Sequence, residues 1–209
     1  WEVAAAPAGM PREPIDSLAW LSAQVPGTAA GALRAAGRWD FSQPRDFDAE
    51  DWWWRVRFRA EPGDAVLGFD GLATLSEVWL DGKAVLASDN MFRAYEVPVA
   101  LQGAHELLIR CRALAPELAK RRPRPRWRVP MLEQQQLRWF RTTLLGRTPG
   151  WSPPCPAAGP WRSVWLETRA LEVGPVKLDA RVEGGVGSVS IVAPLDARVE
   201  QAALIVERD

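Results

Sequence analysis

The strongest constraint on the fold is an apolar–polar alternation with a period of two residues across residues 52–59. Trp52 and every second residue up to Phe58 fall on one face, while Trp53 and three arginines fall on the other. Such alternation is typical of a half-buried β-strand. Similar strand patterns occur at residues 65–69, 75–80, 83–87, 95–99, 106–112 and 164–168. We therefore expect an all-β fold.

Turn residues separate the expected strands. An Asp-Gly pair, Asp81 and Gly82, lies between two alternating stretches and is a strong signal for a two-residue hairpin. Glu-Pro-Gly-Asp at residues 61–64 predicts another turn, before the strand at 65–69.

Three segments do not follow the strand pattern. The opening stretch to residue 22 is expected to be irregular. A two-turn helix is expected over residues 29–36, because Thr28 is a good N-cap and Gly37 a good C-cap. Residues 113–160 are rich in proline and predict a short helix at 116–120 followed by a long excursion. A loop of this length in a compact domain is usually functional.

The composition shifts after residue 174, which predicts a second domain. Three further strand patterns occur at residues 176–182, 189–192 and 203–206. Three short strands are too few to close a β-sandwich. We expect a first domain at 1–171 and an incomplete β-domain at 172–209.

The chain starts at Trp1 without an initiator Met and ends directly after a strand pattern, so we expect a piece of a longer protein. Any signal peptide would precede it, and the compartment stays open. The redox state of Cys111 and Cys155 is open as well, because two thiols without a spacing motif define neither a disulfide framework nor a metal site. Cys111 lies in a strand pattern, where a small buried hydrophobe is expected.

The charges argue against a nucleic acid or a membrane as partner. Lys plus Arg and Asp plus Glu number 26 each, which leaves no sequence-wide field for a polyanion or an anionic bilayer. No apolar run approaches the roughly 20 residues of a membrane span. The basic run at residues 120–128 contains Trp127 and is the best nucleic-acid candidate, but its prolines prevent a recognition helix. We expect it to be solvated or to dock on an acidic neighbouring domain.

No catalytic, metal or cofactor site is expected. The chain lacks a Gly-Lys-Ser/Thr phosphate loop, and the Gly-rich stretch at 184–187 precedes a strand and not a helix. His105 is the only histidine, which rules out a His-rich metal site, and a surface or turn role is expected for it. The acidic cluster at residues 46–51 could supply paired carboxylates for glycoside hydrolysis, but a hydrated turn is expected there.

Five segments together carry a family resemblance. They are Leu-Ser-Ala-Gln-Val-Pro-Gly-Thr at 21–28, Trp-Trp-Arg-Val-Arg-Phe at 53–58, Phe-Asp-Gly-Leu-Ala-Thr and Val-Trp-Leu-Asp-Gly within 69–82, Asp-Asn-Met-Phe-Arg-Ala-Tyr at 89–95, and Trp-Arg-Ser-Val at 161–164. Over residues 20 to 170 the chain resembles the N-terminal domain of family 2 glycoside hydrolases, most closely those of β-mannosidase type.

This resemblance implies a fold and a division of labour. The fold is a jelly-roll (galactose-binding-like) β-sandwich, and the tail resembles the start of the family's immunoglobulin-like domain. Catalysis in the family is retaining and uses two Glu on a (β/α)₈ barrel, which would be the partner of this domain. A barrel takes about 250 residues, so we expect the chemistry to lie outside this chain, and the chain alone to be inactive.

One loop of the family domain reaches the sugar, through a Gly-Trp-Asp-Trp-Gly-Pro motif. This chain has Gly-Trp-Ser-Pro at 150–153, so the resemblance makes Trp151 and Ser152 candidate substrate-binding residues, with Ser152 in place of the Asp when the motifs are aligned forward. Aligned backward from Trp161, Gly150 takes that place. Arg141 matches the Arg of the family's preceding Arg-Lys-Ala-Gln run. The lost carboxylate leaves the sugar and the linkage open.

Two further interpretations remain. Twelve Trp against one Tyr is a heavy loading, and we expect most of these rings in the core or between domains. An autonomous carbohydrate-binding module would instead need an exposed aromatic platform, which Trp127, Trp139 or Trp151 could supply. A family relative that acts on another β-linked sugar, or is inactive, is the other alternative.

Overall fold

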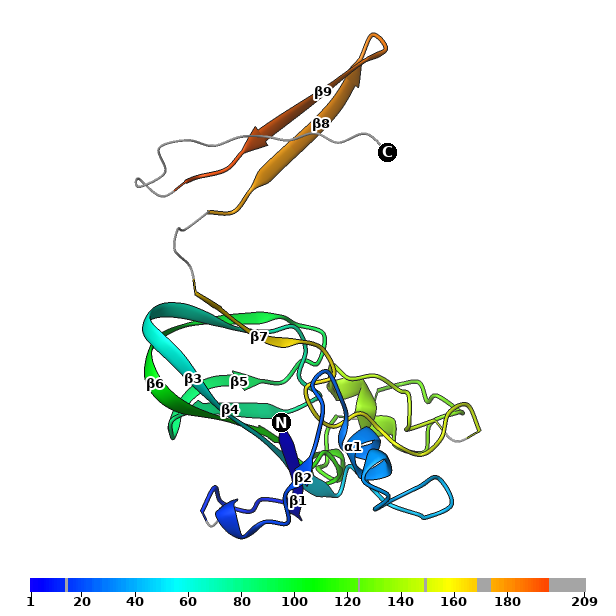
Figure 1. Cartoon of the computed structure of the whole chain (residues 1–209). Coiled ribbons are helices and arrows are strands. Elements are labelled where there is room, and N and C mark those ends of the chain that lie inside the picture. The colour runs from blue at the N-terminus through cyan, green and yellow to red at the C-terminus, as the bar shows by residue number, and fades with distance from the viewer. Residues whose placement is uncertain (14, 124, 149, 169–173, 196–209) are drawn as a thin grey trace. The chain divides into compact units, whose positions relative to one another are not determined.

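The computed structural model describes residues 1–13, 15–123, 125–148, 150–168 and 174–195. By contact density the chain divides into two compact units, Trp1–Glu167 and Thr168–Asp209 (Figure 1). The third strand pattern of the tail, at 203–206, lies outside the described residues.

Two long antiparallel strands dominate the first unit. Strand β3 (Glu50–Phe69) pairs with β6 (Tyr95–Cys111) along nearly its whole length. The turn expected at residues 61–64 is therefore wrong: the chain continues as one strand, with a bulge between Ala60 and Gly63. Pro62 lies in this bulge, where its missing N–H removes no ladder hydrogen bond.

The seven strands of this unit form one sheet that folds back on itself. Its order is β2-β1-β3-β6-β4-β5, and β7 pairs with β3. The remaining bounds are β1 Glu2–Pro7, β2 Leu21–Ser22, β4 Ser76–Leu80, β5 Lys83–Ser88 and β7 Val164–Thr168. In Figure 1, β3 and β6 curve together from the layer of β4 to the layer of β7. The expected all-β sandwich is confirmed.

The prediction of an irregular opening is wrong for residues 2–7, which form β1. Alanine is a poor strand former, so Ala4, Ala5 and Ala6 carry little local signal. Pairing of β1 with β3, Ala4 opposite Trp53, overrides this weak propensity.

The main core fills the space between the layers. Trp52, Trp54 and Phe69 of β3 are at most 1% exposed and pack with apolar residues of β4 and β6. Cys111 belongs to this cluster, as expected, and its burial raises the pKa of the thiol to about 12. Both cysteines are free thiols.

The second face of β3 is buried at Trp53 and Arg55, where an exposed face was expected, whereas Arg57 and Arg59 are exposed as expected. Trp53 is fully buried and stacks on Trp79 at a centroid distance of 5.5 Å. Arg55 lies under the segment of the 3-10 helix η1 (Ile15–Ser17), with its guanidinium 4.0 Å from the Trp20 ring. The same guanidinium bonds Asp16 at 2.8 Å. The N-terminal segment, distant in sequence, covers this face.

Helix α1 (Ala29–Ala35) confirms the helix prediction. The Thr28 hydroxyl accepts the Gly31 N–H at 3.2 Å. At the other end Gly37 has φ +63°, a left-handed conformation that favours glycine.

The acidic lead-in to β3 is not the hydrated turn that was expected. Asp51 is fully buried and accepts hydrogen bonds from Arg110 at 2.6 and 3.0 Å, from the Gly9 N–H at 2.9 Å and from the Ala113 N–H at 2.7 Å. A carboxylate taken out of water needs such partners to offset its desolvation.

The Asp81-Gly82 hairpin is confirmed, with both residues at positive φ. The Asp81 carboxylate accepts from His105 Nδ1 at 2.7 Å and from the Glu106 N–H at 2.8 Å. His105 Nε2 in turn accepts the Gln102 N–H at 2.9 Å, so Nδ1 carries the proton. His105 thus supports the hairpin turn through Asp81, but it lies within strand β6 with its side chain only 8% exposed, and not at the surface.

The described part of the second unit is a hairpin of β8 (Lys177–Glu183) and β9 (Val186–Val192). Gly184 and Gly185 form its two-residue turn, both at positive φ. The Leu178/Ile191 and Ala180/Val189 pairs lie on one face. The first two strands of the tail are confirmed.

Replacing Asp51 with Ala removes the buried acceptor of the Gly9 and Ala113 N–H groups and leaves Arg110 with only its weaker pair to Glu77 at 3.3 Å. We expect a loss of about 3–5 kcal/mol in the free energy of unfolding, measured by urea denaturation. Asp64→Ala on the exposed part of the same strand is the control and should shift stability by less than about 0.5 kcal/mol. Equal effects of the two variants would contradict a structural role for the buried carboxylate.

The Asp81 hydrogen bonds predict a pH dependence. Partial burial raises the pKa of Asp81, but the bonds from His105 and the Glu106 N–H outweigh it and hold the pKa below its ordinary 3.8. The stabilisation is therefore present above pH 3.8 and decreases as the pH falls through the lower folded pKa. Asn tolerates positive φ, so Asp81→Asn should keep this turn. The variant should lose less stability than the unmodified chain as the pH falls below about 4. An unchanged acid limb would contradict this assignment.

Candidate functional site

The candidate site is the loop at residues 141–153, which lies in the later part of the excursion, before the closing strand β7. Arg141 holds the start of this loop through its backbone: its carbonyl accepts the Met91 N–H at 3.0 Å, and it forms an isolated bridge with Asn90. Its side chain is exposed. Thr143 donates its N–H to Met91 Sδ at 3.0 Å, a second tie to the same segment.

The segments that carry the family resemblance meet around this loop. The Trp161 indole N–H donates to the Met91 carbonyl at 2.8 Å, and the ring lies so close to Gly71 that a Cβ there would contact it. The Trp165 indole N–H donates to Asp70 at 3.0 Å. Met91, which also bonds the loop, therefore links Trp161 to it.

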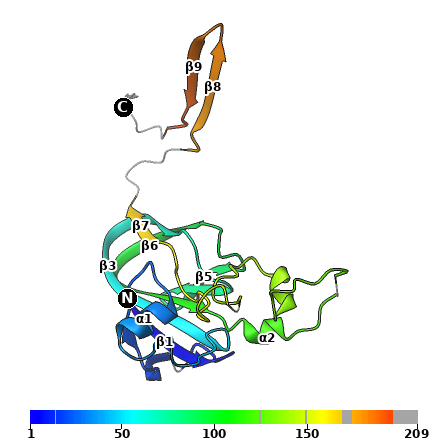
Figure 2. The ribbon, with the colours of Figure 1, turned by 90° about the vertical axis from the view of Figure 1, so that its right-hand side faces the viewer.

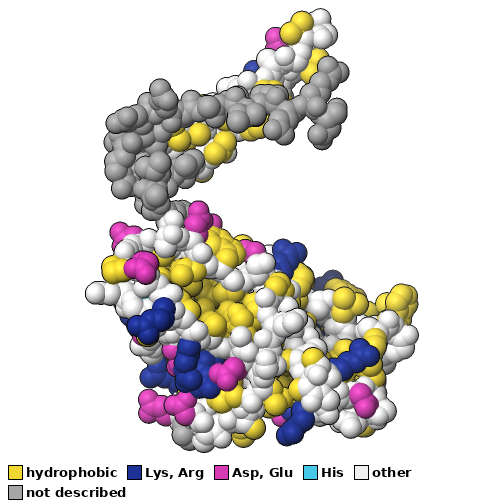
Figure 3. All heavy atoms as spheres, viewed as in Figure 1, with side chains coloured by type: hydrophobic (Ala, Val, Ile, Leu, Met, Phe, Trp, Pro, Cys, Tyr) yellow, Lys and Arg dark blue, Asp and Glu magenta, His cyan; other side chains and the backbone are white. Residues whose placement is uncertain are grey.

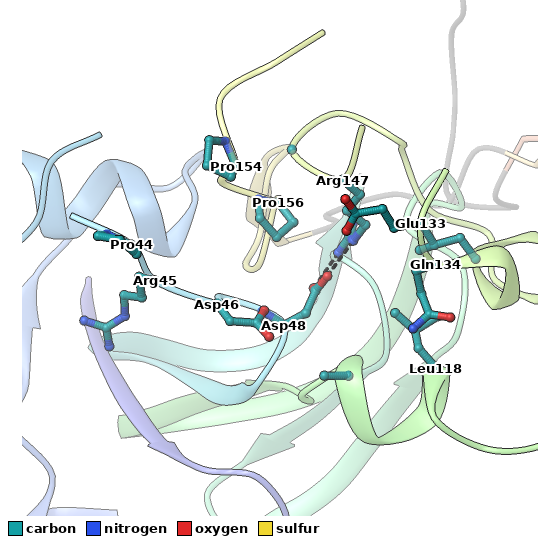
Figure 4. A pocket seen from close by; sticks show the side chains of 13 residues that line it. Pro44, Arg45, Asp46, Asp48, Leu118, Glu133, Gln134, Arg147, Pro154 and Pro156 are labelled. Carbon is teal, nitrogen blue, oxygen red and sulfur yellow. Dashed lines mark hydrogen bonds and ion pairs between the residues drawn. The ribbon is translucent and has the colours of Figure 1, made fainter. Parts of the chain in front are cut away.

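Arg147 anchors the loop to the lead-in of β3. Its guanidinium makes two bonds to the Asp48 carboxylate, both at 2.7 Å, and a further bond to the Thr143 carbonyl at 3.0 Å (Figure 4). The Arg147 side chain is 6% exposed and that of Asp48 14%. Sequence reasoning missed Arg147, because its partner lies 99 residues away.

Ser152 closes the loop on itself. Its hydroxyl accepts the Gly146 N–H at 2.7 Å. Gly146 has φ +80°, and a Cβ there would run into the backbone of Cys155 and Pro156. Trp151, next to Ser152, is 75% exposed. Ser152 and Arg141 thus hold the loop, whereas Trp151 presents a large apolar ring to solvent.

A cleft of about 570 Å³ lies behind the loop (Figure 4). It is lined by Pro44, Arg45, Asp46, Asp48, Ala115, Leu118, Glu133, Gln134, Leu137, Gly146, Arg147, Pro154 and Pro156. Apolar side chains make part of its lining, with carboxylates and an amide among them. Such a mixture can accept hydrogen bonds from a polar ligand. Within the described ranges, no group of three or more His, Cys, Asp and Glu residues is placed to hold a metal ion.

The tryptophans divide sharply by position. Trp127, Trp139 and Trp151 are 62%, 49% and 75% exposed, and all three belong to the excursion at 113–160. The other nine are buried or half-buried. Most tryptophan side chains therefore lie in the packed interior, as expected, and every strongly exposed tryptophan lies in the excursion. Exposed apolar groups are visible on the face drawn in Figure 3.

The fold matches solved structures at low sequence identity. A β-D-mannosidase from Dictyoglomus thermophilum superposes with a TM-score of 0.73 at 24% sequence identity, over 91% of this chain and 24% of that one. An exo-chitosanase from Amycolatopsis orientalis superposes with a TM-score of 0.57 at 13% identity, over 92% and 23%. These likenesses establish the fold.

Sequence comparison establishes the family. The pattern of the family described as "Glycosyl hydrolase 2 galactose-binding domain-like" matches residues 1–162, so this chain belongs to that family. Beta-mannosidase B of Aspergillus fumigatus is 31% identical over 162 residues, which cover 72% of this chain. Beta-mannosidase B of Emericella nidulans is 31% identical over 182 residues, or 74% of this chain. The chain spans only about a fifth of these relatives, 19% and 20%. It resembles the N-terminal domain of β-mannosidases.

The Arg147–Asp48 pair generates a test of the loop anchor. Arg147→Gln removes both charge-assisted bonds to Asp48 and leaves that carboxylate half-buried without its partner. We expect faster cleavage within residues 141–153 by a dilute nonspecific protease and a loss of about 2–4 kcal/mol in stability. Arg45→Gln is the control, because Arg45 lines the same cleft but pairs with Glu50 and ties no loop of the excursion. Equal protection of the loop in both variants would show that Arg147 is not its anchor.

Proposed function

We propose that this chain is the non-catalytic N-terminal part of a β-mannosidase-like exo-glycosidase and that its 141–153 loop forms one wall of the sugar pocket. The observation that carries the proposal is Trp151, an exposed ring on a loop held by buried contacts. The ligand is a β-linked glycoside, and the neighbouring part is a catalytic (β/α)₈ barrel.

Trp151 has the properties that a sugar wall needs. An indole presents a flat apolar face that packs against the apolar face of a pyranose ring. The Arg147 and Ser152 bonds fix the loop before a ligand arrives, and a preorganised loop loses little entropy on binding. The Ser152 hydroxyl oxygen accepts the Gly146 N–H, and its proton remains able to donate to a sugar oxygen.

Ser152 also bears on the choice of sugar. The β-mannosidase motif has an Asp in this loop, and a carboxylate makes charge-assisted bonds about twice as strong as those of a neutral group. A hydroxyl at this place binds a sugar more weakly and selects less sharply. The proposed substrate class is therefore a β-linked sugar and not mannose alone.

The chemistry is assigned to the barrel for a geometric reason. Retaining hydrolysis needs two carboxyl groups about 5–5.5 Å apart on a rigid frame. The acidic groups of the β3 lead-in that pair with arginine serve the fold: Asp51 with Arg110, Asp48 with Arg147 and Glu50 with Arg45. The chain itself supplies binding surface and support.

The 209-residue chain should therefore release no nitrophenol from aryl β-mannoside, β-glucosaminide or β-galactoside. The absorbance of released nitrophenol is followed at about 400 nm for a full day. A commercial glycosidase serves as the positive control. Turnover that disappears on mutation of a single carboxylate, such as Glu133→Gln in the cleft, would overturn the proposal.

A second candidate function is an autonomous carbohydrate-binding module, favoured by the three exposed tryptophans of the excursion. Calorimetric titration with mannose, glucosamine and manno-oligosaccharides separates the two. The accessory function predicts no saturable heat. Saturable binding tighter than millimolar that is lost in Trp151→Ala would favour the module.

A further inference from the structure

The excursion carries a small lobe with its own apolar core. Helix α2 (Ala115–Leu118) and the 3-10 helix η2 (Gln135–Trp139) belong to it, and Figure 2 shows this part projecting to one side of the strands. Its core consists of Leu114, Leu118, Leu132 and Leu137. The lobe is thus a structured feature of the surface.

A side-chain clasp orders the turn that carries Trp127. Gln135 accepts the Val129 N–H at 3.0 Å and donates to the Val129 carbonyl at 2.8 Å. Arg138 donates to Gln135 and also to the Trp127 carbonyl at 3.1 Å. The Arg138 guanidinium stacks 4.4 Å from the centroid of the Trp127 ring. Because the ring is still 62% exposed, its opposite face is open.

The cations that precede and flank Trp127 in the sequence differ in their partners. Lys120 and Arg122 both pair with Glu117. In contrast, Arg121, Arg126 and Arg128 have no acidic partner within the described ranges, and all three are exposed. Arg126 and Arg128 flank Trp127 directly. We call Arg121, Arg126, Trp127 and Arg128 the basic edge.

We propose that the basic edge binds an anionic oligosaccharide of the uronate type. The open indole face would stack on a pyranose ring, and the unpaired guanidinium groups match the geometry of uronate carboxylates. This binding is separate from the sugar pocket of the proposed function and does not depend on it.

The two other anionic ligands fit less well. Single-stranded nucleic acid is bound by several stacking rings along a continuous basic groove, whereas the basic edge has one ring and the chain as a whole carries no net charge. An acidic peptide supplies carboxylates but no sugar face to cover the indole.

Calorimetric titration of the 209-residue chain tests the proposal, with hexagalacturonate as the probe. We expect saturable binding that weakens as NaCl is raised from about 50 to 500 mM, because exposed charges are screened. Mannohexaose, hexathymidylate and hexaglutamate should bind at least about tenfold more weakly, since each lacks either the carboxylates or the pyranose rings.

Variants assign the binding to the edge. Arg126→Gln with Arg128→Gln should weaken hexagalacturonate binding roughly tenfold. The matched control, Arg59→Gln with Lys83→Gln, removes two exposed charges elsewhere and should leave the affinity unchanged. Trp127→Ala should lose binding, while Trp127→Phe should retain most of it. Thermal unfolding checks that every variant is folded.

Three results would contradict the proposed binding at the basic edge. No binding of hexagalacturonate, equal binding of hexathymidylate or hexaglutamate, or equal weakening by both double variants would overturn the proposal. Hydrolysis of an aryl glycoside by the chain would contradict the proposed function alone, because that function concerns a different surface.

Discussion

The fully buried carboxylate of Asp51 is the interaction on which the rest of the first unit depends. It bonds the N-terminal segment at Gly9, the end of β6 at Arg110 and the first residue of the excursion at Ala113. Three residues earlier, Asp48 accepts the Ala115 N–H through its carbonyl and binds Arg147 through its carboxylate. The short acidic lead-in therefore holds both the beginning and the end of the excursion against the sandwich.

This arrangement explains how a proline-rich excursion can carry a defined surface. Loops lose conformational entropy when they are ordered, and about 1–2 kcal/mol is lost for each residue fixed. Two buried ion pairs, a leucine core in the lobe and the Gln135 clasp offset that cost at separate points. The rings of Trp127 and Trp151 are exposed on segments that are themselves held, which is the condition for a useful binding surface.

Local patterns in the sequence predict the strands, the capped helix and the Asp-Gly hairpin, because each depends on residues a few positions apart. They fail where distant segments decide. The bulge at Ala60–Gly63 resembles a turn until β6 pairs across it. Trp53 and Arg55 resemble an exposed face until Ile15 and Trp20 cover them. Asp48 resembles a solvated acid because its partner, Arg147, lies far along the chain. Trp151 and Ser152 are predicted as site residues only by the family resemblance. No local pattern in the sequence indicates that Arg147 anchors the loop.

The continuity of β3 and β6 has a consequence for how the unit opens. Each strand passes from one layer to the other without a connecting loop, and the two remain hydrogen-bonded on both sides of the bulge. Neither layer can separate from the other by the motion of a hinge loop between them. The amides of both halves should exchange with solvent in a single cooperative event, with the lobe and the N-terminal segment exchanging at lower free energy.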